Sequence, residues 1–444
     1  MSSTGPSQSN ALAAGASTRA PADAHDIAPG DIAIGVVIGR ASEYFDYFVY
    51  GIASVLVFPW VFFPFESRLI GILYSFLIFS FAFIARPIGS LLFMMVQRRF
   101  GRGTKLILAL FLLGTSTAGI AFLPGYAELG ESAVVLLAIL RVGQGIALGG
   151  SWDGLPSLLA LSAPRSRRGW YAMMGQLGAP LGFAIAAGLY ALLNTSLEET
   201  DFLSWGWRYP FFCAFAINVV ALFARLRLVV TDQYADLLNV RELEPSDGRE
   251  LLRSQGLNVV LGAFGALASY ALFHLVTVFP LSWILLYSTQ SVSAFLLIQI
   301  LGAFLAAVGT VASGLIADRI GRRRTLKALA TLIAVFSGFA PTLLGGGTLG
   351  QDVFILIGFS LLGLSYGQAA GAMNASFEPK FRYTGAALTS DLAWLIGAGL
   401  APLVALALSA NFGLGYVSLY LLSGAACTLA ALWVNRKLEE RDEA

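Results

Sequence analysis

The sequence predicts an all-α membrane protein, with twelve transmembrane helices arranged as two six-helix bundles. Three observations support this prediction. Of the 444 residues, 57% are hydrophobic and 12% are charged, about half the charged fraction of a soluble domain. Apolar segments long enough to cross a bilayer recur along the whole chain. A short charged motif also occurs at the same place in each half of the sequence.

The apolar segments are continuous rather than alternating in short pieces, which favours helices over a β-barrel. An even number of spans would place both ends of the chain on one side of the membrane. The segments lie at about 32–63, 69–95, 104–124, 132–160, 168–193, 208–228, 258–287, 292–316, 325–345, 353–375, 385–408 and 415–434.

Arginine and lysine gather in alternate loops and in the C-terminal tail, whereas the opposite loops carry mainly glutamate and aspartate, together with Arg68 and Arg208. Positive residues stay on the cytoplasmic side of membrane proteins. We therefore expect a multi-pass protein of the plasma membrane, the inner membrane in bacteria, with both termini in the cytoplasm.

An internal repeat divides the chain. Arg99-Phe-Gly-Arg102 and Arg319-Ile-Gly-Arg322 follow the second span of each half. Repeats in the same orientation indicate two bundles with a binding site between them near the middle of the membrane. The predicted parts are a disordered cytoplasmic tail (1–30), a six-helix bundle (31–230), a cytoplasmic linker (231–256), a second six-helix bundle (257–435) and a short tail (436–444).

Three charged residues, Arg40, Glu43 and Asp46, follow one side of the first predicted span. At 1.5 Å per residue they lie deep in the membrane, where a charge costs at least about 2.5–3.5 kcal/mol. One interpretation is an internal ion pair in which Arg40 neutralises a carboxylate. That pair leaves the second carboxylate unexplained, so we favour a functional use.

Several motifs resemble the major facilitator superfamily and, more narrowly, its metabolite:proton symporter family, which includes carriers of shikimate, citrate, 2-oxoglutarate and proline/betaine. They span nearly all of residues 32–434. The matching runs are Glu43-Tyr-Phe-Asp46-Tyr-Phe-Val-Tyr50-Gly51, Ala85-Arg86-Pro87-Ile88-Gly89, Arg141-Val-Gly143-Gln144-Gly145, Gly149-Gly150-Ser151-Trp152, Gln176-Leu-Gly178-Ala-Pro180-Leu-Gly182, Ser204-Trp-Gly-Trp-Arg208-Tyr-Pro210, Gly314-Leu-Ile-Ala-Asp318-Arg319-Ile-Gly321-Arg322-Arg323 and Arg382-Tyr383-Thr384-Gly385.

The resemblance implies alternating access coupled to protons, with no cofactor and no enzymatic activity. Proton coupling is assigned to Glu43, Asp46 and Asp153. Substrate binding is assigned to Arg40, Arg141, Gln144, Trp152, Gln176, Tyr44, Tyr47, Tyr270 and Asp391, because polar and aromatic side chains orient small ligands. Gating is assigned to Arg86, Arg99, Arg102, Asp318, Arg319 and Arg322.

The chain also departs from the family pattern. In the first copy of the repeated loop, Arg98 stands where the family has an aspartate. In the family that aspartate caps a helix end and pairs with arginines where the two bundles meet on the cytoplasmic face. Ser151 stands where the family has a glutamate, and Asp153 follows two residues later. We expect the contacts by which this loop of the first half closes the cytoplasmic face to be rearranged or weaker. We expect Asp153 to be either the replacement proton carrier or a structural residue.

Arg141 lies about as deep in the membrane as the carboxylates and needs an anion. It forms either a fixed salt bridge with Glu43 or Asp46, or a switchable one that releases it for an anionic substrate once a carboxylate takes a proton; we favour the second. Asp391 is either a site residue or a shallow partner of Lys380 or Arg382. His274, in an apolar run, is more often a hydrogen-bonded packing residue than a proton carrier.

Other chemistry finds no support in the sequence. Cys213 and Cys427 lie in apolar runs, and no metal, nucleotide or catalytic motif is present. We expect a monomeric importer of a small organic acid, with protons, the substrate and the lipid bilayer as partners and no nucleic acid. The alternatives are a symporter of a zwitterionic osmolyte or amino acid, a proton-coupled exporter, and a membrane sensor that binds a ligand without moving it.

Overall fold

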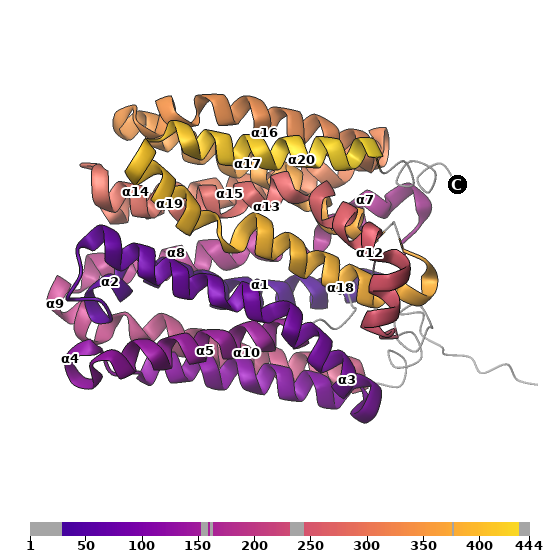
Figure 1. The fold of residues 1–444 in the computed structure, drawn as a ribbon, viewed down its shortest axis with the longest axis horizontal. Coiled ribbons are helices and arrows are strands. Elements are labelled where there is room, and N and C mark those ends of the chain that lie inside the picture. Colours follow the sequence, from indigo (N-terminus) through magenta and orange to yellow (C-terminus); the bar gives the residue numbers. More distant parts are fainter. Residues whose placement is uncertain (1–28, 152–158, 160–162, 231–243, 375–376, 435–444) are drawn as a thin grey trace, which may run out of the picture.

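The computed structural model describes residues 29–151, 159, 163–230, 244–374 and 377–434, and every regular element in these ranges is helical. Long helices run side by side in two layers (Figure 1). In that view most helices from α1 to α10 lie in the lower part and most of those from α12 to α20 in the upper part, with α12 and α18 at middle height. We call these two groups of helices the N-terminal and the C-terminal half. The surface along which the two halves meet is called the seam.

The N-terminal half contains helices of very different length. They are α1 (Pro29–Leu56), α2 (Phe58–Val61), α3 (Arg68–Phe122), α4 (Tyr126–Leu129), α5 (Glu131–Gly150), the 3₁₀ helix η1 (Arg165–Arg167), α7 (Arg168–Met174), α8 (Gly178–Ser196), α9 (Glu199–Asp201), the π-helix η2 (Phe202–Gly206) and α10 (Arg208–Val230).

The C-terminal half repeats the pattern of long helices joined by short connections. Its elements are α12 (Gly248–Gly265), α13 (Leu267–Thr277), α14 (Phe279–Tyr287), α15 (Val292–Ile320), α16 (Arg322–Leu344), α17 (Gly347–Asn374), the 3₁₀ helix η4 (Pro379–Phe381), α18 (Arg382–Ala393), the π-helix η5 (Trp394–Gly399), α19 (Ala401–Phe412) and α20 (Gly415–Val434).

The repeated loop has the same backbone in both halves. Gly101 has a φ of 85° and breaks α3 between two of the predicted spans, and Gly321 has a φ of 86° between α15 and α16. Only glycine adopts such angles without strain. The repeated glycine therefore makes the tight turn that sends each chain back across the membrane.

Ten helices in the described ranges are long and apolar enough to span a membrane. One of them, α3, takes in two of the predicted spans. The helix α1 falls outside this set because its inner part carries Arg40, Glu43 and Asp46. The fold is thus all-α and built of membrane-spanning helices, as the sequence predicts.

Small residues bring α3 and α5 into direct backbone contact. A Cβ added to Gly89 would lie 2.2 Å from the Ile146 carbonyl oxygen, and one added to Gly145 would lie 2.3 Å from that of Ala82. The expected close packing at the Gly143-Gln-Gly145 motif is confirmed, because a side chain at these positions would force the helices apart.

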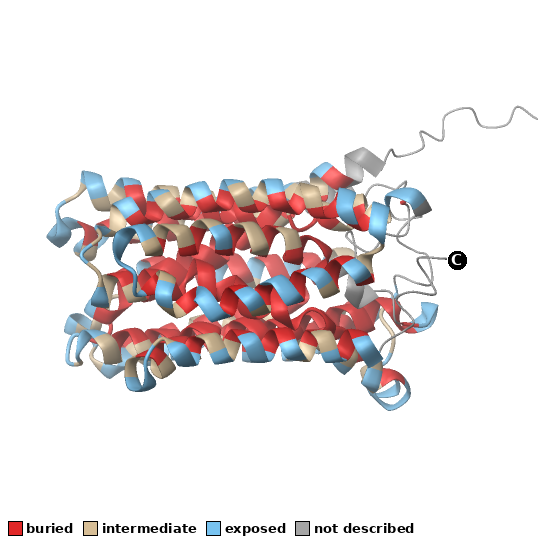
Figure 2. Cartoon of the chain, turned by 90° about the horizontal axis from the view of Figure 1, so that it is seen from above, coloured by how far each residue is buried: buried red, intermediate tan, exposed pale blue. Residues whose placement is uncertain are grey.

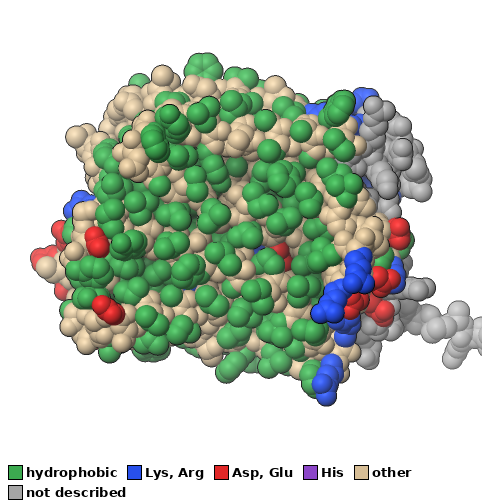
Figure 3. All heavy atoms as spheres, in the orientation of Figure 1, with side chains coloured by type: hydrophobic (Ala, Val, Ile, Leu, Met, Phe, Trp, Pro, Cys, Tyr) green, Lys and Arg blue, Asp and Glu red, His purple; other side chains and the backbone are tan. Residues whose placement is uncertain are grey.

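Burial and charge are distributed as a membrane requires. Buried residues fill the middle of the bundle, and exposed ones lie at its ends and on outward faces (Figure 2). Hydrophobic side chains cover the face seen in Figure 3, and most arginines and lysines there gather at the end where α12 and α18 lie. The proposed boundaries of the two bundles stay predictions, since residues 231–243 of the linker lie outside the described residues.

Candidate functional site at the seam

Ten buried rings from both halves meet at the centre of the seam, and we call them the seam cluster. Trp394, the first residue of the π-helix η5, has its ring centroid 5.6 Å from that of Tyr47 and 5.0 Å from that of Phe273. Phe48 stacks on Phe273 across the seam at 5.6 Å and 8°. The members are Tyr44, Tyr47, Phe48, Phe79 and Phe83 from the N-terminal half, and Tyr270, Phe273, His274, Tyr366 and Trp394 from the C-terminal half.

Glycines in η5 explain how the rings approach so closely. A Cβ on Gly397 would lie 2.5 Å from the Tyr270 Cβ, and one on Gly399 would lie 2.6 Å from the Phe83 Cβ. The π-helix therefore lets this segment contact both halves. Such irregular turns are frequent at functional sites.

Two hydrogen bonds cross the seam inside the cluster. Tyr47 Oη lies 3.2 Å from His274 Nε2, and the hydroxyls of Tyr44 and Tyr366 bond to each other. His274 Nδ1 also bonds to Thr277 Oγ1 at 3.2 Å. His274 is thus a hydrogen-bonded packing residue, the alternative that the sequence favours, and it also joins the two halves.

Asp46 lies inside the N-terminal half, next to the cluster, at the end of a chain of hydrogen bonds. Arg141 Nη1 donates to Gln144 Oε1 at 3.0 Å, Gln144 Nε2 donates to Thr117 Oγ1 at 2.9 Å, and Thr117 Oγ1 donates to Asp46 Oδ1 at 2.9 Å. All four side chains are buried. The chain links a carboxylate on α1 to a guanidinium on α5 through neutral groups.

The fixed salt bridge considered for Arg141 is replaced by neutral partners. Its Nε donates to the carbonyl of Phe79 at 3.2 Å, and its guanidinium carbon lies 3.8 Å from the ring centroid of Tyr50 and 5.7 Å from that of Tyr47. Its Nη2 finds no hydrogen-bond partner among the described residues. Aromatic faces and carbonyls hold the cation and leave one donor for a further acceptor.

Arg40 and Glu43 form the ion pair that the sequence suggests. Arg40 Nη1 lies 2.8 Å from Glu43 Oε2, one helical turn apart on α1. This pair leaves Asp46 as the carboxylate without an ion pair within 4 Å in the described part of α1.

Of the two alternatives for Asp391, the shallow position is wrong, and the role of this residue at the site stays a prediction. Instead of lying shallow beside Lys380 or Arg382, it is 3% exposed, and its Oδ1 accepts from Arg86 Nε at 2.7 Å across the seam. Its Oδ2 accepts from the Ser90 hydroxyl. Lys380 instead pairs with Glu250 at 2.5 Å. The sequence places Asp391 two turns from a basic motif, but helix packing brings the arginine of the other half closer.

At the arginine-rich end, the second copy of the repeated loop clamps the other half. Asp318 Oδ1 accepts from the backbone N–H of Gly169 at 2.6 Å, and Oδ2 accepts from that of Trp170 at 3.1 Å, in the first turn of α7. Arg322 Nη2 reaches the carbonyl of Arg168 at 3.5 Å. These contacts join the two halves at this end, and the gating roles of both residues stay predictions.

The first copy uses different residues, as the Arg98 substitution suggests. Buried Lys105 donates to Gln97 Oε1 at 3.1 Å and to Tyr383 Oη at 2.9 Å, at the start of α18. Arg98 itself makes an exposed pair with Asp247 at 3.8 Å. Gln97, Lys105 and Tyr383 are missing from the sequence-based site. A lysine at the edge of an apolar span was the signal that could have pointed to them.

The opposite end of the seam is closed as well. Asn194, near the end of α8, donates to Ser293 Oγ at the start of α15 at 2.8 Å. A cavity of about 10 Å³ remains between the rings of Phe48, Phe183 and Phe273, no more than the ~10–15 Å³ that one water needs. The described residues are therefore in a closed state with the seam cluster tightly packed.

Other predicted site residues contribute less or cannot be placed. Tyr44, Tyr47 and Tyr270 belong to the seam cluster, whereas Gln176 is buried in the turn between α7 and α8. Arg99 and Arg319 are exposed, and Arg102 is half-buried. Trp152 and Asp153 lie outside the described residues, so the proposed role of Asp153 stays a prediction. In the described ranges, no group of three His, Cys, Asp or Glu could hold a metal ion.

The architecture and the seam define a class: a membrane carrier in which two helical halves meet at a buried polar and aromatic site. The sequence model of the family described as "Sugar (and other) transporter" matches residues 32–244. The inner membrane metabolite transport protein YhjE of Escherichia coli strain K12 is 37% identical over 416 residues, which cover 91% of this chain and 94% of that protein.

Two further comparisons agree. The shikimate transporter of the same E. coli strain is 30% identical and covers 90% of this chain and 92% of its own length. The crystal structure of a D-xylose–proton symporter has the same fold, with a TM-score of 0.71 at 20% identity, over 91% of this chain and 97% of that one. The chain belongs to the major facilitator superfamily, among the bacterial metabolite transport proteins, and is a membrane transporter rather than an enzyme.

Proposed function

We propose that this transporter is a proton-coupled symporter that imports a small organic acid by alternating access. The observation that carries the proposal is the buried chain from Arg141 through Gln144 and Thr117 to Asp46, beside the seam cluster. It couples one group that exchanges a proton to one group that binds anions. The relative that transports shikimate supports an organic acid as substrate.

The proposed cycle uses this coupling. With the site open to the outside, Asp46 takes a proton, and the Arg141 guanidinium is then balanced by the substrate carboxylate instead of the protein carboxylate. Burial disfavours charge, so a site carrying proton and substrate together is the form best able to pass the low-dielectric closed state. Release of the substrate and the proton inside resets the protein.

Glu43 contributes differently in this scheme. Its carboxylate is paired with Arg40 at 2.8 Å, so in this scheme it holds the Arg40 side chain in place rather than carrying the proton. Arg86 and Asp391 hold the seam closed on the arginine-rich side and separate when that side opens. The hydrogen bonds of Asp318 and Lys105 across the seam hold the same side closed.

A zwitterionic substrate is the second candidate, favoured by the seam cluster. Four tyrosines and Trp394 offer ring faces, which attract ammonium groups, while the arginines nearby are balanced by Glu43 and Asp391. An osmolyte or amino acid carries both an ammonium and a carboxylate, and the two features together suit such a molecule.

We expect a monomeric protein of the bacterial inner membrane with both termini in the cytoplasm. The arginine-rich end is the cytoplasmic one by the positive-inside rule. The relative named as an inner membrane protein supports this location.

Transport in proteoliposomes tests the proposal. With an imposed gradient, acidic outside, labelled shikimate and a labelled zwitterion such as glycine betaine are supplied separately. A symporter accumulates its substrate, and a protonophore abolishes the accumulation. Accumulation of the zwitterion alone would favour the second candidate. Accumulation only with the reversed gradient would indicate an exporter, and binding without uptake would indicate a sensor; both results contradict the proposal.

A further inference from the structure

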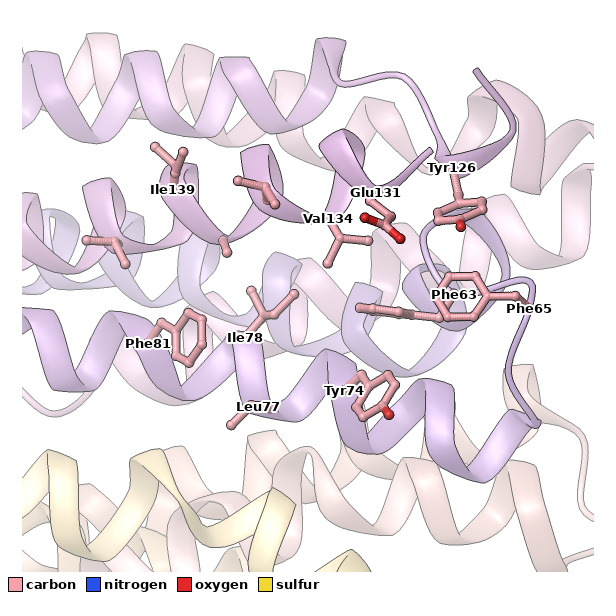
Figure 4. Close-up of a pocket in the computed structure, with 13 residues that line it drawn as sticks. Phe63, Phe65, Tyr74, Leu77, Ile78, Phe81, Tyr126, Glu131, Val134 and Ile139 are labelled. Atoms are coloured by element: carbon pink, nitrogen blue, oxygen red, sulfur yellow. The ribbon is translucent and has the colours of Figure 1, made fainter. Parts of the chain in front are cut away.

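A second pocket lies on the outer surface of the N-terminal half. It occupies about 650 Å³ between the first part of α3 and α5 (Figure 4), at the end of the bundle where α4 lies (Figure 1). Leu77 and Phe81 from α3, with Val135 and Ile139 from α5, line its length. Leu77 and Ile139 are 43% and 60% exposed, so the pocket opens toward the surface that faces lipid.

The mouth of this pocket differs from its apolar length. Aromatic rings surround it: the centroids of Phe65 and Tyr126 are 4.6 Å apart, and those of Phe63 and Tyr74 are 5.5 Å apart. Glu131 is the charged residue of the lining, and its carboxylate points toward these rings (Figure 4). A carboxylate beside several ring faces attracts a cation.

The surrounding loops are mainly acidic, although they also carry Arg68 and Arg208. Glu66 follows Phe65 in the chain, and Glu128 lies on α4 together with Tyr126. An occupant must therefore combine a long aliphatic chain, which fills the groove, with a positive group at the mouth. A soluble cation would leave the apolar length empty, and an anionic lipid would bring negative charge against Glu131.

We propose that this pocket binds a phospholipid with a primary ammonium headgroup, phosphatidylethanolamine, from the leaflet at this end of the protein. One acyl chain lies between α3 and α5, and the ammonium contacts the Glu131 carboxylate and the faces of Phe65 and Tyr126. No residue that lines the pocket belongs to the seam cluster or to the chain from Arg141 to Asp46.

Native mass spectrometry of the purified full-length protein tests the proposal. The protein is delipidated in detergent and then given phosphatidylethanolamine or phosphatidylglycerol with matched acyl chains. We expect the wild type to retain about fivefold more of the ethanolamine lipid. In Glu131→Gln, this preference is expected to disappear while some binding of both lipids remains.

A second variant tests the groove itself. Ile139→Trp fills the apolar length and is expected to lower binding of both lipids severalfold. Leu297→Trp is the matched control, because Leu297 is also 60% exposed on a lipid-facing helix but lies outside the pocket. Equal retention of the two lipids by the wild type, an unchanged preference in Glu131→Gln, or the same effect of both tryptophan variants would overturn the proposal.

Discussion

Arg141 shows how a full positive charge is kept in the interior of a membrane protein. It is 1% exposed, and its positive charge is stabilised by a carbonyl, an amide and the face of Tyr50 at 3.8 Å. Each contact is neutral, so the charge is spread rather than cancelled. An anion that reaches Nη2 would gain a strong charge-assisted hydrogen bond.

Replacement of Arg141 tests this role. Arg141→Ala is expected to weaken binding of an anionic substrate by about thirtyfold or more, because loss of a buried charged donor costs about 2–5 kcal/mol. Arg141→Lys keeps the charge without the planar contacts, so its affinity for the substrate should lie between those of the wild type and Arg141→Ala. Isothermal titration calorimetry measures both, with thermal unfolding as the folding control. Unchanged affinity in Arg141→Ala would remove the arginine from the site.

The sequence predicts residue identities here better than residue partners. Arg40, Glu43, Asp46 and Arg141 stand out because charge is rare in apolar spans, and all four lie beside or within the buried site. The pairing of Arg86 with Asp391 could not be predicted, since the two residues are 305 positions apart in the chain. The contacts of Lys105 could not be predicted, because a lysine at the edge of a span has the pattern of an ordinary loop charge.

At the scale of elements, the two copies of the repeated loop have diverged in chemistry while keeping the same fold. Gly101 and Gly321 make the same turn, but Asp318 caps the first turn of α7, whereas Lys105 and Gln97 bond to Tyr383 on α18. The repeat and its glycines could be predicted from the sequence. These substitute contacts depend on how helices of opposite halves meet, and the sequence alone does not contain that information.

Breaking the pair of Arg86 and Asp391 should open the arginine-rich end. Removal of one partner of a buried ion pair costs about 3–5 kcal/mol, so Asp391→Asn is expected to shift the protein toward the state open at that end. Arg99 and Arg319 are exposed and occupy equivalent places in the two halves, so each can be replaced by a spin-labelled cysteine. Opening is then expected to lengthen the distance between the two labels in double electron–electron resonance. Ser90→Ala, which removes a neutral donor to the same carboxylate and leaves the ion pair, is the control. Identical distance distributions in Asp391→Asn and wild type would contradict this role.

The start of α12 provides a pH-dependent test outside the membrane. Backbone N–H groups of Glu250 and Arg249 hold the pKa of Asp247 below its ordinary value of 3.8. The folded pKa is the lower one, so the stabilisation is complete above about pH 4 and is lost as the pH falls through the folded pKa. The cap should be stable throughout the physiological range.

Hydrogen exchange at the amides of Arg249 and Glu250 measures this cap. In Asp247→Ala exchange is expected to rise severalfold at neutral pH, because the side chain that accepts from both amides is gone. Asp247→Asn retains a capping oxygen and should stay close to wild type. Equal exchange in Asp247→Ala and wild type would show that the cap does not hold this helix start.

For the whole molecule, transport requires the two halves to separate at one end at a time. Both ends are closed in the described residues, through Asn194 and Ser293 at one end and Asp318 and Gly169 at the other. The all-α membrane fold could be predicted from composition and from the apolar segments. The closed state could not, because one sequence serves every state of the cycle.

A reversible cross-link tests this motion. In a background without Cys213 and Cys427, the pair Asn194→Cys and Ser293→Cys is expected to form a disulfide on oxidation, since the native side chains touch at 2.8 Å. Uptake should fall to background and return on reduction. Either single cysteine variant is the control. Full uptake by the oxidised double variant would mean that α8 and α15 need not separate.

The central claim is that Asp46 carries the proton that drives uptake. The most direct measurement is the pH of the weakly buffered medium around proteoliposomes when substrate is added without an imposed pH gradient. Wild-type protein is expected to make the medium alkaline as protons enter with substrate, whereas Asp46→Asn should bind and exchange substrate without proton uptake, and Glu43→Gln should retain it. Substrate-induced proton uptake of wild-type size in Asp46→Asn would contradict the account.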